Sequence, residues 1–226
     1  MNFDFVTADP HFDHDAIRRH CGRPYPTVED MNEAEVSNWN EIVGKKDLVV
    51  VGGDFAFKNH GHWLHALNGR KILIRGNHDH MSQEILKNFT EVHDLWTTNN
   101  DGRLVTFCHY AMLSWRSSCH GSWHLYGHSH GRIPERPDVL SFDIGVDVWG
   151  FRPIPWEVVR AKMSMKESKD FYSGHEDSLA TRVESLRTSN LRLYADVTKT
   201  SLVPEQSESP DSQGLEKPQN PVDNPT

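Results

Sequence analysis

The chain of 226 residues lacks most features that mark secreted, membrane-spanning or disulfide-bonded proteins. Its three cysteines form no C-x-x-C pair, and so sparse and odd a set argues against a disulfide framework or a thiolate zinc site. No apolar run approaches the roughly 18 residues of a membrane helix. The first residues show no basic region followed by an apolar core, as a signal peptide would. We therefore expect a cytoplasmic protein without a membrane partner.

Positive charge is also scarce. The chain has 24 Lys and Arg against 32 Asp and Glu, which gives a net charge of −8 with histidine counted neutral. This balance argues against a broad electrostatic grip on long nucleic acid or on an anionic membrane. It allows a nucleotide in a pocket where metal ions supply the positive charge. Histidine, by contrast, is abundant, with 15 residues, and the positions of these histidines decide what chemistry the chain supports.

Apolar runs and helical patterns alternate over residues 1–163, which predicts a mixed α/β domain. Thr27 with Asp30 resembles a capping box at the start of one helix, and Gly44 is a natural stop for it. Pro155 is a good first residue for another helix. Strands are expected at residues 3–8, 48–51, 72–74, 104–108, 125–126 and 140–148, and helices at 27–43, 63–67, 82–87 and 155–163.

The composition changes after residue 163. Residues 164–197 are charged, with scattered apolar side chains, and predict a charged and helical appendage to the first domain. Residues 198–226 are rich in Pro, Ser, Gln and Asn. A segment of this kind buries too little apolar surface to offset the entropy of ordering it, so we expect a disordered tail.

Polar motifs follow the expected strands, at the end of a sheet where α/β folds build their sites. Taken singly, each motif has an ordinary alternative: Asp-Pro often initiates a turn, and a lone histidine after a strand is more often structural than a ligand. Taken together, they indicate a metal site. In chain order the motifs are Asp9-Pro10-His11, Gly53-Asp54, Gly76-Asn77-His78-Asp79, His109 and Gly127-His128-Ser129-His130.

The spacing within these motifs suggests how the ligands are shared. Asp9 and His11, like His128 and His130, are two residues apart, and on an extended backbone such pairs point the same way. The seven candidate ligands are too many for one tetrahedral zinc ion and suit two divalent ions that share a carboxylate. Nitrogen and oxygen donors without thiolate fit Mn, Fe, Zn, Ni or Co, and we expect Mn²⁺ first. The candidates are Asp9, His11, Asp54, Asn77, His109, His128 and His130.

The order of these motifs, over residues 3–155, is similar to that of the calcineurin-like metallophosphoesterases. Gly22-Arg23-Pro24-Tyr25 and the helix with Trp39-Asn40 resemble the small single-domain bacterial and phage members. The resemblance implies an α/β fold, a two-sheet β-sandwich flanked by helices, with the dimetal site at the carboxyl ends of strands.

The resemblance also implies roles for single residues. Asp9, His11 and His130 would hold the first ion, whereas Asn77, His109 and His128 would hold the second, and Asp54 would bridge both. The catalytic pair would be His78, beside the substrate phosphate, and Asp79, which would help to keep the proton on His78. Two metals would activate a bridging hydroxide that attacks phosphorus. We expect a metal-dependent hydrolase of phosphodiesters.

The substrate is expected to be a small phosphoester or nucleotide, and three further residues are candidates to bind it. Arg23 is a fork-shaped donor for phosphate, with a salt-bridging role as the alternative. Arg116 could touch a base or a leaving group, and His120 could line the pocket. His14 is expected to be a solvated residue, with support of His11 as the alternative. A phosphomonoesterase, a nuclease, a nucleotide pyrophosphatase and a non-catalytic metal-binding module remain alternative functions.

Overall fold

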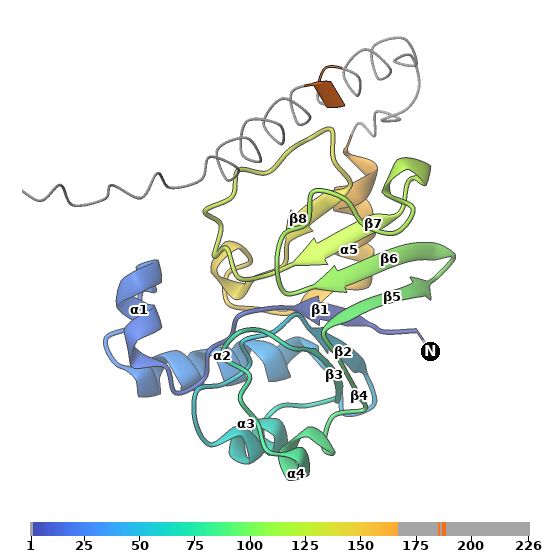
Figure 1. Ribbon diagram of the computed structural model, residues 1–226. Coiled ribbons are helices and arrows are strands. Elements are labelled where there is room, and N and C mark those ends of the chain that lie inside the picture. The colour runs from blue at the N-terminus through green and yellow to red at the C-terminus, as the bar shows by residue number, and fades with distance from the viewer. Residues whose placement is uncertain (1, 167–184, 186, 189–226) are drawn as a thin grey trace, which may run out of the picture. The chain divides into compact units, whose positions relative to one another are not determined.

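In the computed structural model, which describes residues 2–166, 185, 187 and 188, two β-sheets pack face to face (Figure 1). The first sheet has the strand order β4-β3-β2-β1-β9 and the second β5-β6-β7-β8. The predicted α/β class with two sheets flanked by helices is confirmed. No helix in the described part of the chain is long and apolar enough to cross a membrane.

The first sheet is parallel except at one edge. Strands β1 to β4 run in the same direction, and β9 pairs antiparallel with β1. The register aligns Val6 with Val50 and Val50 with Ile72, so the carboxyl ends of β1, β2 and β3 lie at one edge. The strands are β1 (Phe5–Thr7), β2 (Leu48–Val51), β3 (Arg70–Ile74), β4 (Glu91–His93) and β9 (Ile154–Pro155).

The second sheet combines a hairpin with a parallel part. Strands β5 and β6 are antiparallel, whereas β6, β7 and β8 run parallel. The loops after β6 and β7, which carry His109 and His128, therefore leave this sheet at the same edge. The strands are β5 (Leu95–Asn100), β6 (Arg103–Cys108), β7 (Trp123–Tyr126) and β8 (Ser141–Asp143).

The helices begin where the sequence provides caps. At α2 the Thr27 hydroxyl accepts from the Asp30 N–H (3.1 Å), and the Asp30 carboxylate accepts from the Thr27 N–H (3.1 Å), which is the predicted capping box. Ser82 caps α4 in the same general way. The helices are α1 (Asp15–Cys21), α2 (Val28–Ile42), α3 (His60–Ala66), α4 (Gln83–Leu86) and α5 (Trp156–Ser164).

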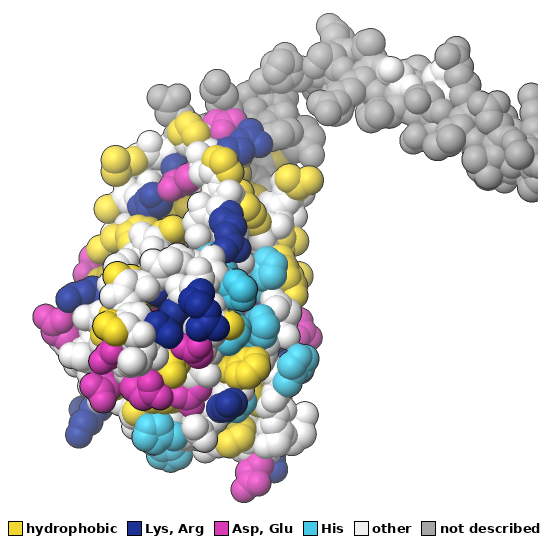
Figure 2. Space-filling view, turned by 90° about the vertical axis from the view of Figure 1, so that its left-hand side faces the viewer, with side chains coloured by type: hydrophobic (Ala, Val, Ile, Leu, Met, Phe, Trp, Pro, Cys, Tyr) yellow, Lys and Arg dark blue, Asp and Glu magenta, His cyan; other side chains and the backbone are white. Residues whose placement is uncertain are grey.

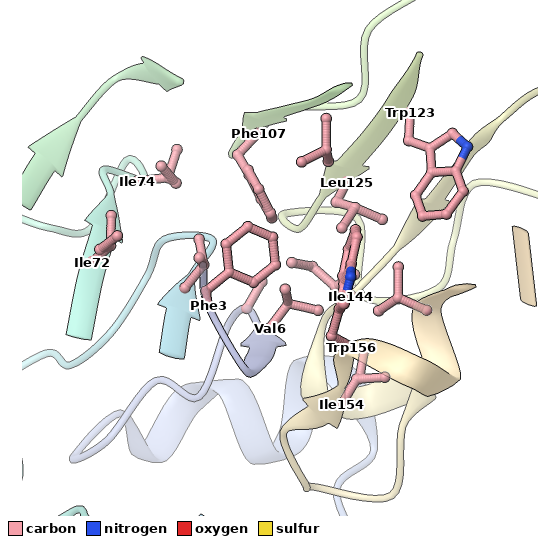
Figure 3. Close-up of a cluster of buried hydrophobic side chains, with 14 of the residues drawn as sticks. Phe3, Val6, Ile72, Ile74, Phe107, Trp123, Leu125, Ile144, Ile154 and Trp156 are labelled. Carbon is pink, nitrogen blue, oxygen red and sulfur yellow. The ribbon is translucent and has the colours of Figure 1, made fainter. Parts of the chain in front are cut away.

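Strand β2 shows how the apolar pattern builds the two cores. Its side chains alternate between the faces of the sheet. Leu48 and Val50 enter the core between the sheets, shown in Figure 3, whereas Val49 and Val51 pack against helices such as α2. All four side chains are buried, which explains why the strand reads as a continuous apolar run.

Some predicted elements differ from the structure. The strand expected at 140–148 ends at Asp143, because the Asp143 carboxylate accepts the Gly145 N–H (2.7 Å) and a 3-10 turn, η2 (Val146–Val148), follows. The short elements α1, β4, β5 and β9 were not predicted. The domain end at residue 163 stays a prediction. The helical appendage expected at 164–197 lies almost wholly outside the described residues, and the disordered tail expected at 198–226 lies wholly outside them.

Candidate metal centre

The loops that follow the strands of both sheets are bonded to one another. The Asp9 N–H donates to the Gly53 carbonyl (3.0 Å), and the His11 N–H donates to that of Asp54 (3.0 Å). The His128 N–H donates to Asp9 Oδ2 (2.8 Å), which joins the second sheet to the first. In the space-filling view, histidine side chains gather on one face of the molecule (Figure 2).

The ligand loops are not extended, as the spacing argument assumed. Asp9, His11, Asp54, His128 and His130 all have left-handed backbones, with φ of 56°, 55°, 52°, 65° and 48°. Residues in this region cost about 1–3 kcal/mol each and persist where the surrounding structure imposes them. Asp9 and His11 lie in one group of candidate ligands, whereas His128 and His130 lie in different groups. The expectation that His128 and His130 point the same way from an extended segment is therefore corrected.

The first group consists of Asp9, His11 and His130, whose ligand atoms lie within 4.8 Å of one another. His130 Nδ1 donates to Asp147 Oδ2 (2.7 Å), and His11 Nδ1 lies 3.1 Å from His14 Nδ1. Asp9 Oδ1 and His11 Nε2 are buried and have no hydrogen-bond partner. The group therefore holds two buried atoms that can coordinate a metal and that have no hydrogen-bond partner, as expected of a cation site.

The second group consists of Asp54, His109 and His128, again within 4.8 Å. His109 Nδ1 lies 2.8 Å from the Gly52 carbonyl oxygen and donates to it, which turns Nε2 toward the group. The Asn77 side-chain oxygen lies 3.2 Å from that Nε2. All three residues that the resemblance assigns to the second ion thus lie beside Asp54.

Asp54 lies between the two groups. Its Oδ2 is 3.4 Å from His11 Nε2 and 3.4 Å from His109 Nε2. Its Oδ1 accepts the N–H of His78 (2.8 Å). One carboxylate oxygen thus faces a histidine of each group, the position that a bridging ligand needs.

Glycine is required where the loops approach the two carboxylates. A Cβ on Gly127 would lie 2.5 Å from Asp9 Oδ2, and one on Gly76 would overlap Asp54 Oδ1. Any larger residue would push these carboxylates out of place. The glycines in the two motifs therefore serve the geometry of the site.

The electrostatics also fit a cation. Burial raises the pKa of Asp9 to about 7, and the nearby His109 and His130 oppose that rise only in part. Burial lowers the pKa of His11 to about 2, which keeps the imidazole neutral and able to bind a metal. These residues, with nitrogen and oxygen donors and no thiolate, fit a divalent transition metal.

The chain is similar to several known proteins in sequence or in fold. No family model matches the chain. The uncharacterized protein MJ1445 of Methanocaldococcus jannaschii is 28% identical over 165 residues, which cover 69% of this chain and 88% of that protein. A structure of the protein of unknown function AQ665 from Aquifex aeolicus shares the fold, with a TM-score of 0.55, 19% identity, and 70% and 97% of the two chains covered. A novel archaeal phosphodiesterase aligns with a TM-score of 0.40, 18% identity, and 62% and 82% covered.

Five motifs that lie far apart in the sequence meet at one place in a fold of two packed sheets. Their order is that of the family named above. The chain resembles the calcineurin-like metallophosphoesterases.

Arg23 is bonded within the chain and has no donor left for a substrate. Its side chain is fully buried, and all five of its N–H donors are used. Nη1 donates to the Pro10 carbonyl (2.9 Å) and to Glu35 (3.0 Å), and Nη2 donates to the Asp9 carbonyl (2.7 Å). Nε and Nη2 donate to the two oxygens of Asp147, each at 2.9 Å. The expectation that Arg23 binds phosphate is corrected, and its alternative of a salt-bridging role is what the structure shows.

Asp147 was missed by the sequence argument. It accepts from both Arg23 and His130, and so connects a buried cation to a candidate ligand. Burial acts to raise the pKa of Asp147, but its hydrogen bonds with His130 and Arg23 lower it. No motif marks this aspartate, because it lies in η2 beyond the last histidine motif.

Asp79 has a different role from the one expected. Its Oδ2 accepts the N–H groups of Asp54 (2.8 Å) and Gly76 (2.7 Å), and its Oδ1 accepts that of Phe55 (2.9 Å). Burial raises the pKa of this carboxyl, and the three N–H donors oppose the rise. Asp79 therefore fixes the loops after β2 and β3, and its carboxylate oxygens accept from these backbone groups where we expected Asp79 to help keep the proton on His78.

His78 lies beside the first group without joining either one. Its ring centroid is 5.4 Å from that of His11 and 5.4 Å from that of His14. The ring is half-buried, so one part can reach a bound molecule. His14, expected to be solvated, instead contacts both His11 and His78.

Arg116 and His120 lie on the loop between β6 and β7, and His120 ends the turn η1 (Ser118–His120). Both residues are exposed. Within the described part of the chain, neither side chain has a hydrogen bond or ring contact to a residue of the two ligand groups. Their assignment to the substrate stays a prediction.

Proposed function

We propose that the chain is a dinuclear metal-dependent phosphoesterase that hydrolyses phosphodiesters of the nucleotide type. The observation that carries this proposal is the position of Asp54 Oδ2, 3.4 Å from a histidine of each ligand group. A shared carboxylate between two sets of nitrogen and oxygen donors is the arrangement of two-metal hydrolases.

Each candidate ligand would bind one of the two ions or both. Asp9, His11 and His130 would hold one ion and Asn77, His109 and His128 the other, with Asp54 shared. Two divalent ions bound there would supply positive charge to the phosphate oxygens and lower the pKa of a bound water.

The chain itself orients these ligands and supplies a proton. The Gly52 carbonyl and Asp147 each accept from the Nδ1 of one ligand histidine, which fixes the ring and leaves Nε2 for the ion. His78 would give a proton to the leaving oxygen, because its ring lies beside the first group and is not one of the ligands. Asp54 holds His78 in this position by accepting its backbone N–H. Asp79 holds the loop that carries His78.

The test is metal content and turnover of the full chain. We expect purified protein with Mn²⁺ to bind two ions and to hydrolyse bis-p-nitrophenyl phosphate faster than p-nitrophenyl phosphate. Faster hydrolysis of the monoester would show that the chain is a phosphomonoesterase and not a phosphodiesterase. A chain that takes up Mn²⁺ but hydrolyses neither ester, nor a cyclic nucleotide, dinucleotide or single-stranded nucleic acid, would be a non-catalytic metal-binding module.

A further inference from the structure

Two aromatic rings are exposed at the edge of the candidate metal centre. Among the large hydrophobic side chains that are exposed in the described part of the chain, only Phe57 (49% exposed) and Tyr110 (46%) are aromatic. Single exposed apolar residues are ordinary on protein surfaces. These two are unusual because each ring contacts histidines of the site.

Phe57 lies on the side of the first ligand group. Its ring stacks on His14, with centroids 4.6 Å apart and an angle of 11° between the planes. The centroid of His78 is 6.4 Å away. His14 covers one face of the ring, and the exposed half of the residue is free to receive another planar group.

Tyr110 lies on the side of the second ligand group. Its ring centroid is 5.0 Å from that of His109 and 4.8 Å from that of His128, with edge-on geometry in both pairs. Tyr110 therefore contacts the second ligand group directly, whereas Phe57 contacts His14, whose Nδ1 lies 3.1 Å from that of His11 in the first group. Asp54 lies between the two groups. Histidine and hydrophobic side chains also lie next to one another on the face in Figure 2.

We propose that Phe57 and Tyr110 are two stacking subsites, one for each substituent of a phosphodiester with planar aromatic groups, such as a nucleobase. The inference rests on the proposed function and narrows it to a substrate class. A monoester has a single substituent and could occupy only one ring. Because Phe57 is the ring beside His78, it receives the leaving group, and Tyr110 receives the group that stays on phosphorus.

Two diesters that share a leaving group distinguish the role of Phe57 from that of Tyr110. They are thymidine 5′-(p-nitrophenyl) phosphate and methyl p-nitrophenyl phosphate, tested on the full chain with Mn²⁺. We expect Tyr110→Ala to lower kcat/KM about ten-fold for the thymidine ester, the effect of one lost stacking contact, and to leave the methyl ester nearly unchanged. Phe57→Ala should lower both by a similar factor, because both carry the aryl leaving group, and Phe57→Trp should retain both activities.

Leu113→Ala is the matched control, since Leu113 is fully exposed, lies on the same loop as Tyr110 and contacts no site histidine in the described structure. The metal content of every variant is measured so that a loss of ions is distinguished from a loss of stacking. Equal losses on both esters in Tyr110→Ala, no loss in Phe57→Ala, or the same losses in Leu113→Ala would overturn the proposal.

The same two esters are also titrated as ligands by calorimetry. If the wild type hydrolyses neither, the proposed function fails, and the subsites are then judged by binding alone. Tighter binding of the thymidine ester than of the methyl ester, reduced by Tyr110→Ala, would support them. Equal binding of the two esters would overturn them.

Discussion

Arg23 and Asp147 are joined by two parallel hydrogen bonds of 2.9 Å, although they lie 124 positions apart in the sequence. Asp147 accepts from His130, and Arg23 holds the carbonyl of Asp9. One buried guanidinium therefore sets the positions of two of the three members of the first ligand group. A planar fork can do this because its donors have a fixed geometry.

Arg23→Lys should weaken the first ligand group. Lysine keeps the charge but cannot bond both oxygens of Asp147 and two carbonyls together. We expect Mn²⁺ affinity at one of the two sites to fall about 10–100-fold, the usual effect of losing a partner of a metal ligand. Calorimetric titration measures it, and Arg75→Lys is the control, because the Arg75–Asp94 pair is exposed. Unchanged binding of both ions by Arg23→Lys would show that Asp9 and His130 keep their positions without the guanidinium group.

Asp54→Asn should affect both groups, since its Oδ2 faces a histidine in each. An amide cannot supply the negative charge that two cations share, so we expect at most one Mn²⁺ in the purified variant. Elemental analysis gives the count. Asp94→Asn, at an exposed aspartate, should keep the wild-type content. If Asp54→Asn also keeps two ions, Asp54 is not the bridge.

His78→Ala should separate chemistry from metal binding. His78 contacts the first group but belongs to neither set of ligand atoms, so the metal content should stay close to that of the wild type. Turnover of diesters with poor leaving groups should fall about 10²–10⁴-fold, as loss of a general acid does. His80→Ala, two residues on and exposed, is the matched control. Loss of metal in His78→Ala would contradict the assignment.

The sequence predicts those parts of the fold whose signals are local. Strand β2 was predicted with the bounds that it has, because Leu48 to Val51 are all buried, and the cap of α2 was predicted from two residues of one turn. Short elements such as α1 and β4 escaped because seven or three residues carry little periodicity, and Ile17 is the only buried residue of α1.

The candidate site, too, could be predicted only where its signals are local. Candidate ligands could be found because they follow strands in short motifs. The left-handed backbone of Asp9 could not be foreseen, since its N–H is bonded to Gly53 on a loop far away in the sequence. Arg23 was assigned to substrate for a similar reason: its partner Asp147 is fixed only by the folded chain.

Asp79→Ala tests a role that only the structure suggests. The Asp79 carboxylate satisfies three backbone N–H groups, and each buried donor left without a partner costs about 1–3 kcal/mol. We expect a loss of several kcal/mol in the free energy of unfolding, measured by urea denaturation, together with a loss of metal. Asp94→Ala is the exposed control. A stable, metal-loaded Asp79→Ala that lacks only turnover would instead restore the view that Asp79 acts through His78.

Metal affinity should rise with pH. Burial acts to lower the pKa of His109, but the adjacent Asp54 and Asp9 carboxylates outweigh it and raise the pKa to about 9. Below that pH the metal-free site holds a proton on His109, and an ion that binds Nε2 must displace it. The Mn²⁺ association constant should therefore increase up to about ten-fold per pH unit as the pH rises toward 9, where the proton is already lost. Anaerobic calorimetry in buffers of different ionisation enthalpy measures both the affinity and the protons released, and a constant affinity without proton release would show that His109 does not bind the ion.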